Sequence, residues 1–511
     1  MNNTEVGEDR GGRVGRGVVK SQVAKLVDVV LASLVTILVS RWLGPDDFGR
    51  FSLILGWVSF AGLAISLGFS EVLTRFVPVL ADDGRSIRRF LLNLLAIRTA
   101  LALALGMLIW VTAPVVFVWL KRPELVSSVD WIVLLFWLSQ AADLFWSFFM
   151  ARLRVEVVFA SHTLRQSVII GVVLILSPAG VPSLQPVLIA MCAAYGLSLA
   201  VYGLAFAHGR EPSGSDGLRI NLRPALRFGL SVWLVAALTF LLSEQSDVLL
   251  LGTLVQDSSA VGYYKVGTAL VWKLIGVITA GSPVVLTSLS ILNTQSGMAG
   301  LMRGWQTFIK LSTMTVVPLY ALAGWFAPQI VSTLYGSEYL PSVDVLRLFV
   351  VLTVVPFGLL GGGVHLMALY TLGRERAGLM LRVVSGMVNL ALGILLIRAF
   401  GAIGAVAATG LSAILGIGLE YVMLQRYRPM PYPWAFCLKT TGAVLVGLAA
   451  VLVLPSSTWL EWLIAGLAYV GVIAALLRWW KPLTEEDCEM ISRISPRLRP
   501  MAALFRPAAQ A

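Results

Sequence analysis

The sequence has very little that could face water. Only 13% of its 511 residues are charged, about half the share found in soluble domains, and 58% are hydrophobic. A soluble chain of this composition could not cover its own core. Runs of about 20 apolar residues, the length that a helix needs to cross a bilayer, recur along the chain. Because the alternating segments of a β-barrel do not occur, the sequence predicts an all-α integral membrane protein.

Cysteine is also scarce. Cys192, Cys437 and Cys488 have neither the spacing of a disulfide framework nor that of a metal site, so no metal or cofactor is expected. The net charge of +12 would favour nucleic acid only if the cations formed one patch, but they lie at the ends of apolar runs. No phosphate-binding loop or Ser-His-Asp set is present. The sequence therefore predicts neither an enzyme nor a nucleic-acid partner.

Fourteen spans are expected, at 22–43, 50–72, 89–118, 130–151, 160–178, 185–207, 228–251, 262–287, 305–327, 343–370, 378–399, 402–425, 436–454 and 459–479. The loops after even-numbered spans carry most of the Arg residues, and those after spans 5, 7, 9 and 13 carry no Lys or Arg. Since positive loops stay in the cytoplasm, both termini should be cytoplasmic.

An internal repeat organises these spans. Residues 49–74 align with 262–287 without gaps, at an offset of 213 residues, and seven of 26 positions are identical. The offset places span 2 on span 8, so the chain should form two six-helix lobes related by a pseudo-twofold axis along the membrane normal. The expected parts are a cytoplasmic segment 1–21, an N-lobe 22–207, an inter-lobe loop 208–227, a C-lobe 228–425, two further spans within 436–479 and a cytoplasmic tail 480–511.

Charged side chains inside spans need an explanation, because each costs roughly 2.5–3.5 kcal/mol at the bilayer centre. Polar residues form stripes on spans 1 and 7, and span 8 carries Lys265 and Lys273 near one face. These stripes indicate a hydrated central cleft. Its deeper charges, Arg98 and Lys273, are cations that would attract an anion such as a phosphate or pyrophosphate group. The charges nearer to span ends, such as Lys25 and Asp28, could instead extend to the membrane surface.

Span 10 contains Pro356 followed by Gly358, Gly361, Gly362 and Gly363. Such a run frees backbone groups and is tolerated only against protein or water. Pro356, Gly361 and Gly362 are therefore predicted to form a hinge, although a packing kink fits the pattern equally well.

Four short motifs carry a resemblance to a known family. They are Arg41-x-Leu43-Gly44-Pro45 with Asp47-Phe48-Gly49-x-Phe51, Ser246-Asp247 followed by Gly262-Tyr263-Tyr264, Leu334-Tyr335-Gly336-x-x-Tyr339 and Phe400-Gly401-Ala402-x-Gly404-Ala405. Their order and spacing resemble the Wzx-type polysaccharide and O-antigen flippases of the multidrug/oligosaccharidyl-lipid/polysaccharide (MOP) exporter superfamily. The resemblance covers roughly residues 20–480. It implies two lobes, a cationic central cavity and alternating access in a bacterial inner membrane.

The function that this resemblance implies is the outward transfer of an undecaprenyl-pyrophosphate-linked oligosaccharide, with membrane lipids, glycosyltransferases and a polymerase as partners. Candidate substrate-binding residues are Arg98, Lys265, Lys273, Lys25 and Arg41. Candidates for coupling to an H⁺ or Na⁺ gradient are Asp28, Asp143 and Asp247. Alternatives are a lipid II flippase, a multidrug extruder, whose cationic substrates would favour carboxylates, and a polysaccharide polymerase or ligase, which would need a longer external loop than any found here.

Overall fold

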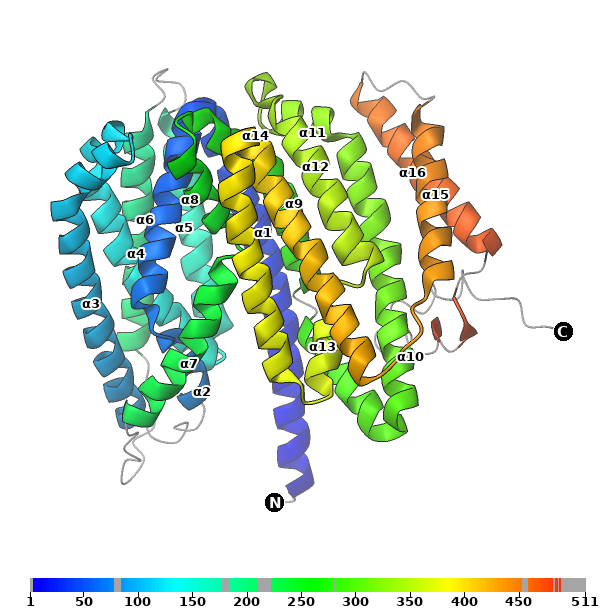
Figure 1. The fold of residues 1–511 in the computed structure, drawn as a ribbon. Helices are drawn as coiled ribbons and strands as arrows, with labels where there is room; N and C mark the ends of the chain where they lie inside the picture. Colours follow the sequence, from blue (N-terminus) through cyan, green and yellow to red (C-terminus); the bar gives the residue numbers. More distant parts are fainter. Residues whose placement is uncertain are drawn as a thin grey trace. The chain divides into compact units, whose positions relative to one another are not determined.

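The computed structural model describes residues 3–77, 84–176, 183–208, 222–279, 282–452, 458–480, 483–485 and 487–488. All regular elements in these ranges are helices (Figure 1). The chain divides into two compact units, residues 1–265 and 266–511, which are described one at a time.

The first unit is a set of packed helices in which α3 lies against α4, α4 and α5 lie against α6, and α1 lies against α5. Its elements are α1 (Asn3–Ser66), α2 (Phe69–Phe76), α3 (Gly84–Trp119), the 3₁₀ turn η2 (Pro123–Ser128), α4 (Val129–Ala151), α5 (Val155–Leu176), α6 (Leu184–Ala207), α7 (Leu222–Phe240), α8 (Glu244–Leu254) and the start of α9 (Ser258–Thr279).

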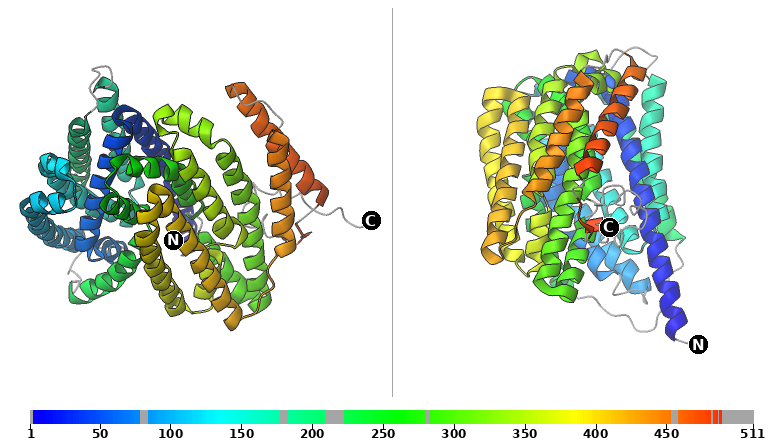
Figure 2. Two further views of the ribbon diagram at one scale, coloured as in Figure 1. Left: turned by 45° about the horizontal axis from the view of Figure 1, so that its top comes forward. Right: turned by 90° about the vertical axis from the view of Figure 1, so that its right-hand side faces the viewer.

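The second unit is built around α10, which packs against α12, α13 and α15, while α15 and α16 lie side by side (Figure 1, Figure 2). Its elements after α9 are α10 (Ser282–Trp325), α11 (Ala327–Leu334), the short turn η4 (Ser337–Tyr339), α12 (Ser342–Val354), the π-helical turn η5 (Val355–Leu359), α13 (Val364–Thr371), α14 (Glu375–Tyr427), α15 (Trp434–Leu452) and α16 (Trp459–Trp480).

The helices of the described ranges account for the fourteen expected spans. Ten are long and apolar enough to cross a membrane, and the bent pair α7–α8 makes an eleventh. Two of the ten, α1 and α14, are each interrupted by a glycine with non-helical backbone angles, Gly44 and Gly401, and so contain two spans each. The remaining expected span, the eighth, corresponds to α9, which is not among the helices that pass this test, so its crossing of the membrane stays a prediction.

Span 7 differs from the expectation of one straight helix. The chain bends by 56° between α7 and α8. Ser243 ends the break, because its side-chain oxygen accepts a hydrogen bond from the Ser246 backbone N–H at 3.4 Å. The predicted polar stripe along span 7 assumed a continuous helix. Its members therefore lie on two helices that point in different directions.

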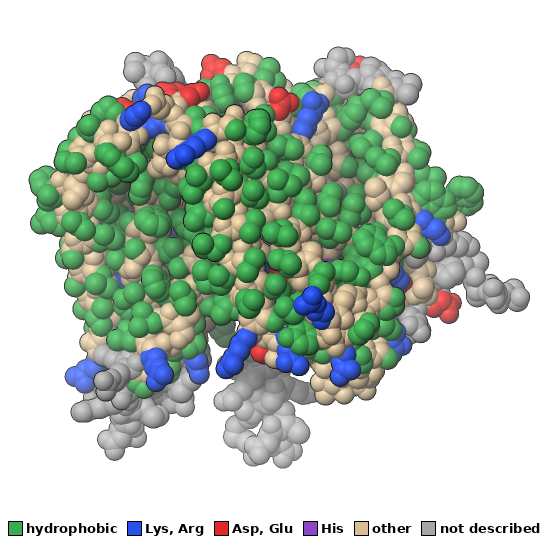
Figure 3. Space-filling view, in the orientation of Figure 1, with side chains coloured by type: hydrophobic (Ala, Val, Ile, Leu, Met, Phe, Trp, Pro, Cys, Tyr) green, Lys and Arg blue, Asp and Glu red, His purple; other side chains and the backbone are tan. Residues whose placement is uncertain are grey.

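The outer surface of the helices is apolar. On α3, large hydrophobic side chains are exposed along most of the second half of the helix, namely Met107, Leu108, Val111, Val115, Val118 and Trp119. Hydrophobic side chains cover most of the visible face in the space-filling view, and charged side chains are sparse on it (Figure 3). Such a surface is stable only against hydrocarbon, so the chain is a multi-pass membrane protein.

A reciprocal helix contact occurs within the first unit. A Cβ atom at Gly49 of α1 would lie 1.8 Å from the Ser258 carbonyl oxygen, and one at Gly262 of α9 would lie 2.2 Å from the Pro45 carbonyl oxygen. The repeat offset of 213 residues relates Gly49 to Gly262 and Pro45 to Ser258. The same contact is therefore made twice with the roles exchanged, as a twofold axis requires. The predicted inter-lobe loop 208–227 lies mostly outside the described residues, so that boundary stays a prediction.

A short segment after α16 returns to α10 in the second unit. Asp487, only 4% exposed, accepts hydrogen bonds from Lys310 Nζ at 2.6 Å and from Thr307 Oγ1 at 2.8 Å. Its carboxylate also accepts from the backbone N–H and the hydroxyl of Thr484, at 2.9 and 2.8 Å. Burial would raise the pKa of Asp487, but these hydrogen bonds and the Lys310 charge hold it below the ordinary aspartate value.

Candidate functional site

A cavity of about 600 Å³ lies inside the first unit. Its wall comes from the second half of α1 and from α3, α4, α6, α7, α8 and the first turns of α9. The polar residues of this wall are Ser52, Ser59, Ser66, Arg98, Ser139, Gln140, Asp143, Tyr195, Ser243, Gln245 and Lys265. Two candidate substrate-binding cations, Arg98 and Lys265, and one candidate coupling carboxylate, Asp143, thus line the same cavity, and their roles stay predictions.

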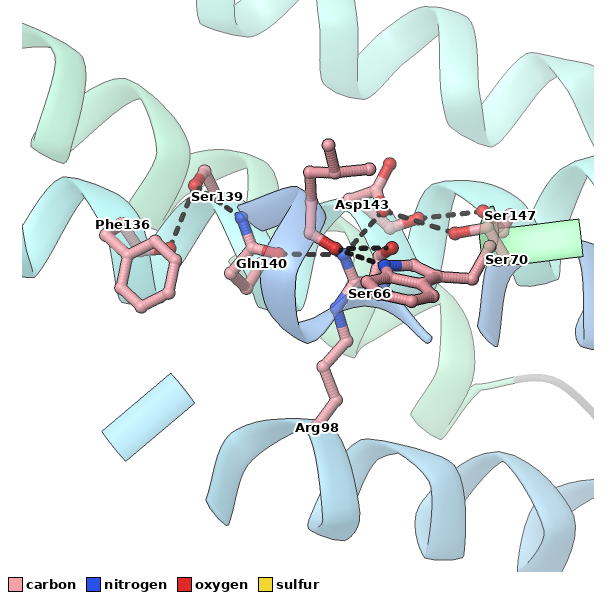
Figure 4. A network of polar contacts seen from close by, with 10 residues as sticks. Ser66, Ser70, Arg98, Phe136, Ser139, Gln140, Asp143 and Ser147 are labelled. Carbon is pink, nitrogen blue, oxygen red and sulfur yellow. Dashed lines mark hydrogen bonds and ion pairs between the residues drawn. The ribbon is translucent and has the colours of Figure 1, made fainter. Parts of the chain in front are cut away.

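Arg98 and Asp143 form an ion pair across two helices of this wall. Arg98 Nη2, on α3, lies 2.8 Å from Asp143 Oδ2 and also donates to Gln140 Oε1 at 2.8 Å. Asp143 and Gln140 lie on α4, three residues apart, so both side chains point to the same side of that helix. Ser70 donates a further bond to Asp143 Oδ2 at 3.2 Å (Figure 4).

The two partners differ greatly in their access to solvent. Arg98 is 3% exposed, whereas the Asp143 side chain is 49% exposed. Two other Arg98 nitrogens, Nε and Nη1, are buried and have no hydrogen-bond partner among the described residues. A guanidinium carries five N–H donors and cannot lose its charge. Arg98 is therefore a buried cation that is bonded to one amide, of Gln140, and to one half-exposed carboxylate, of Asp143.

Lys265 supplies the second cation of the wall. Its Nζ lies 2.9 Å from Glu244 Oε2, and both side chains are largely buried. The sequence predicted a cationic cleft. In the structure, Arg98 and Lys265 are each paired with a carboxylate, because a lone charge in an apolar surrounding is costly.

Hydroxyl groups line the cavity to an extent that the sequence analysis missed. Ser52, Ser59 and Ser66 follow one another at intervals of seven residues on α1, which places them on one side of the helix. The Ser52 hydroxyl is buried and has no hydrogen-bond partner in the part of the chain that the structure describes. The signal in the sequence was this interval of seven residues between serines in a largely apolar span.

The other predicted site residues lie elsewhere. Asp28 of α1 lies 3.3 Å from His162 Nδ1 of α5, and Asp247 is buried and accepts a hydrogen bond from Tyr264 Oη at 2.6 Å. Arg41 is exposed, and Lys273 is partly buried on α9; neither contributes to the cavity wall. The side chain of Lys25 lies outside the described residues.

The predicted hinge residues lie where span 10 breaks in the second unit. Pro356 belongs to the π-helical turn, and Gly361 and Gly363 have φ values of 68° and 82°, which favour glycine. Four consecutive carbonyl oxygens each accept a side-chain hydrogen bond: Phe357 from Ser312 at 2.7 Å, Gly358 from Thr313 at 2.6 Å, Leu359 from Tyr432, and Leu360 from His365 Nε2 at 2.6 Å. The break is therefore a defined structural element with its polar groups satisfied.

The partners of His365 fix its protonation state. Trp305 Nε1, which can only donate, lies 3.0 Å from His365 Nδ1, so this ring nitrogen accepts. The other nitrogen then carries the proton and donates to the Leu360 carbonyl. His365 is thus a neutral, fully bonded side chain that stabilises the break.

Comparison with known proteins agrees with this architecture. The family model described as "Polysaccharide biosynthesis protein" matches residues 38–344, more than half of the chain. No curated protein sequence matches. A solved structure of the lipid II flippase MurJ, in an inward closed conformation, is 14% identical with a TM-score of 0.70 and covers 90% of this chain and 98% of its own. An inward-facing multidrug resistance MATE family transporter of the MOP superfamily is 14% identical with a TM-score of 0.60. It covers 80% of this chain and 98% of its own.

These two likenesses establish the fold, and the family match covers both the cavity wall and the repeat. The resemblance drawn from the loop motifs is confirmed, as is the predicted all-helical architecture of two lobes. The chain therefore belongs to the family of polysaccharide biosynthesis proteins, and its fold is that of the MurJ and MATE structures.

Proposed function

We propose that this transporter moves an undecaprenyl-pyrophosphate-linked oligosaccharide from the cytoplasmic to the external leaflet of the bacterial inner membrane. The observation that carries the proposal is the cavity of the first unit, in which the buried Arg98 faces a wall of hydroxyl groups. A guanidinium binds phosphate oxygens in pairs, and serine and amide side chains bind sugar hydroxyls. A charged headgroup with attached sugars fits both features.

The lipid part of such a substrate needs an apolar surface. In the second unit, a groove of about 850 Å³ runs along α10, α11 and α16, lined almost entirely by hydrophobic side chains such as Leu319, Phe326, Ile330 and Trp462. A hydrocarbon chain that lay in this groove would remain in an apolar environment. The groove supports a lipid-linked substrate over a free sugar.

The proposed direction of transport assumes that the substrate is completed on the cytoplasmic side. Arg residues dominate the loops that we assign to the cytoplasm, so both termini lie inside. Glycosyltransferases that complete the substrate would then act on the side from which it is loaded, and a polymerase would receive it outside.

The test compares cavity cations with a matched surface cation. Arg98→Ala with Lys265→Ala should abolish surface glycan, and adding Lys273→Ala tests the third predicted cation. Arg227→Ala removes an exposed Arg of the same unit and should leave the glycan unchanged. Surface glycan is measured together with the amount of folded protein in the membrane. Normal glycan in the Arg98 and Lys265 variant, at normal protein level, would refute the assignment.

A multidrug extruder is the second candidate, because both cavity cations are neutralised by carboxylates and Asp143 is half exposed to the cavity. An organic cation could bind there. A gene deletion that removes drug resistance but leaves the surface glycan intact would favour this function, and loss of peptidoglycan synthesis would favour lipid II as substrate.

A further inference from the structure

Asp143 occupies a place at Arg98 that suits any oxyanion. Its carboxylate oxygen lies 2.8 Å from Arg98 Nη2, and half of its side chain is open to the cavity. Carboxylate and phosphate oxygens use the same donors of a guanidinium. Arg98 Nε and Nη1 are buried, so a phosphate that enters the cavity would compete for Nη2, which donates to both Gln140 and Asp143.

We propose that Asp143 is a resident anion that the substrate phosphate displaces from Arg98, and that Asp143 takes up one proton as it is displaced. This inference rests on the proposed function, because it concerns the pyrophosphate group of that substrate. Substrate and proton then bind together: the proton moves from solvent to a carboxylate oxygen of Asp143 on loading and returns to solvent on release.

Electrostatics favours this exchange over simple addition of the phosphate. A displaced, ionised Asp143 would lose its cation and lie close to a second anion. Two unit charges about 4 Å apart repel by about 4 kcal/mol at an effective dielectric constant of 20. Loss of an opposite charge and gain of a like charge both favour the neutral acid. Protonation removes the repulsion and keeps the loaded cavity from gaining the full charge of the pyrophosphate.

Other ionisable groups on the helices packed against α4 must be separated from Asp143 in the test. They include Asp28 of α1, Glu71 of α2, Arg98 of α3, His162 and Arg165 of α5, and Cys192, Tyr195 and Tyr202 of α6; Lys265, which is paired with Glu244, belongs to the same cavity wall. Among these residue types, histidine is the one that changes charge near neutral pH in its ordinary state. His162 is therefore the competing proton acceptor.

The experiment is calorimetric titration of the purified full-length protein with a short-chain prenyl pyrophosphoryl N-acetylglucosamine. The diester pyrophosphate of this probe has no proton to exchange near neutral pH, so any proton taken up belongs to the protein. Titrations at one pH, in buffers that differ in ionisation enthalpy, count the protons. We expect uptake approaching one proton per ligand, and an affinity that falls by up to about tenfold per pH unit as the pH rises.

The variants assign that proton to a residue. Asp143→Asn should bind the probe at least as tightly, without proton uptake and with an affinity that does not change with pH. Asp130→Asn, on the same helix but bonded to Trp110 at the other end, should keep the uptake, as should His162→Gln. Binding by the unmodified protein without proton uptake would overturn the exchange and leave the proposed function standing. Absence of probe binding, or full affinity in Arg98→Gln, would instead overturn the proposed substrate.

Discussion

Gly49 and Gly262 each face the backbone of the other's helix, in two contacts that the 213-residue offset interchanges. Two helices that cross this closely leave no room for a methyl group on either side. The internal repeat, first visible as seven identities between apolar segments, thus has a physical counterpart. Glycine is needed at both positions because the helices approach closely there, and not because the backbone has an unusual angle.

This crossing predicts the effect of single methyl groups. Gly49→Ala or Gly262→Ala would place Cβ within 2.2 Å of a backbone oxygen, and the helices must move apart. We expect a loss of about 1–3 kcal/mol of stability, measured by thermal unfolding in detergent. Gly203→Ala on α6 is the control, because its Cβ would meet nothing within 4 Å. The Gly203→Ala variant should keep the stability of the unmodified protein or gain about 0.5–1 kcal/mol. Equal losses of stability at all three positions would show that the crossing is not tight.

The break in span 10 predicts a difference between two neighbouring threonines. Thr313→Val keeps the shape of the side chain but leaves the Gly358 carbonyl without its donor, at a cost of about 1–3 kcal/mol. Thr315→Val, two residues along α10, removes an exposed hydroxyl that bonds only to carbonyls of its own helix and should change little. Thermal unfolding compares them. Equal stability of the two variants would mean that the break does not depend on this bond.

The docked segment after α16 predicts a dependence on pH. Because the folded-state pKa of Asp487 is lowered, its contribution is fully present above about pH 4 and is lost as the pH falls through the folded value. At pH 7, Asp487→Asn should weaken docking by about 1.5–3 kcal/mol, so the amides of Thr484, Glu485, Asp487 and Cys488 should exchange hydrogen roughly tenfold faster or more.

Two comparisons check that docking. Lys310→Gln, which removes the partner, should accelerate the same amides, whereas the unmodified protein should approach the variants only in acid, after correction for the intrinsic exchange rate. Unchanged exchange in both variants at neutral pH would contradict a role for the ion pair.

Sequence reasoning was strongest where a single helix decides the outcome. The spans follow from apolar length, and the breaks at Gly44, Pro356 and Gly401 occur at glycine and proline, which weaken a continuous helix. The bend before Glu244 was missed, since Leu241, Leu242 and Ser243 contain no proline or glycine.

The site was harder to predict because it depends on which helices face each other. Arg98 and Asp143 were both identified, but with separate roles, as a substrate cation and a coupling carboxylate. Periodicity assigns a side chain to one side of its own helix and gives no information on the helix opposite. Their ion pair joins residues 45 positions apart, and only tertiary packing brings them together.

The four bonded carbonyls of span 10 also impose an order on biosynthesis. Ser312 and Thr313 precede the break, and His365 follows it within the same span, so three donors are present when span 10 leaves the ribosome. Tyr432, the donor to Leu359, is made only after α14. Because the chain is synthesised from its N-terminus, span 10 reaches its final shape only when spans 11 and 12 are already in the membrane.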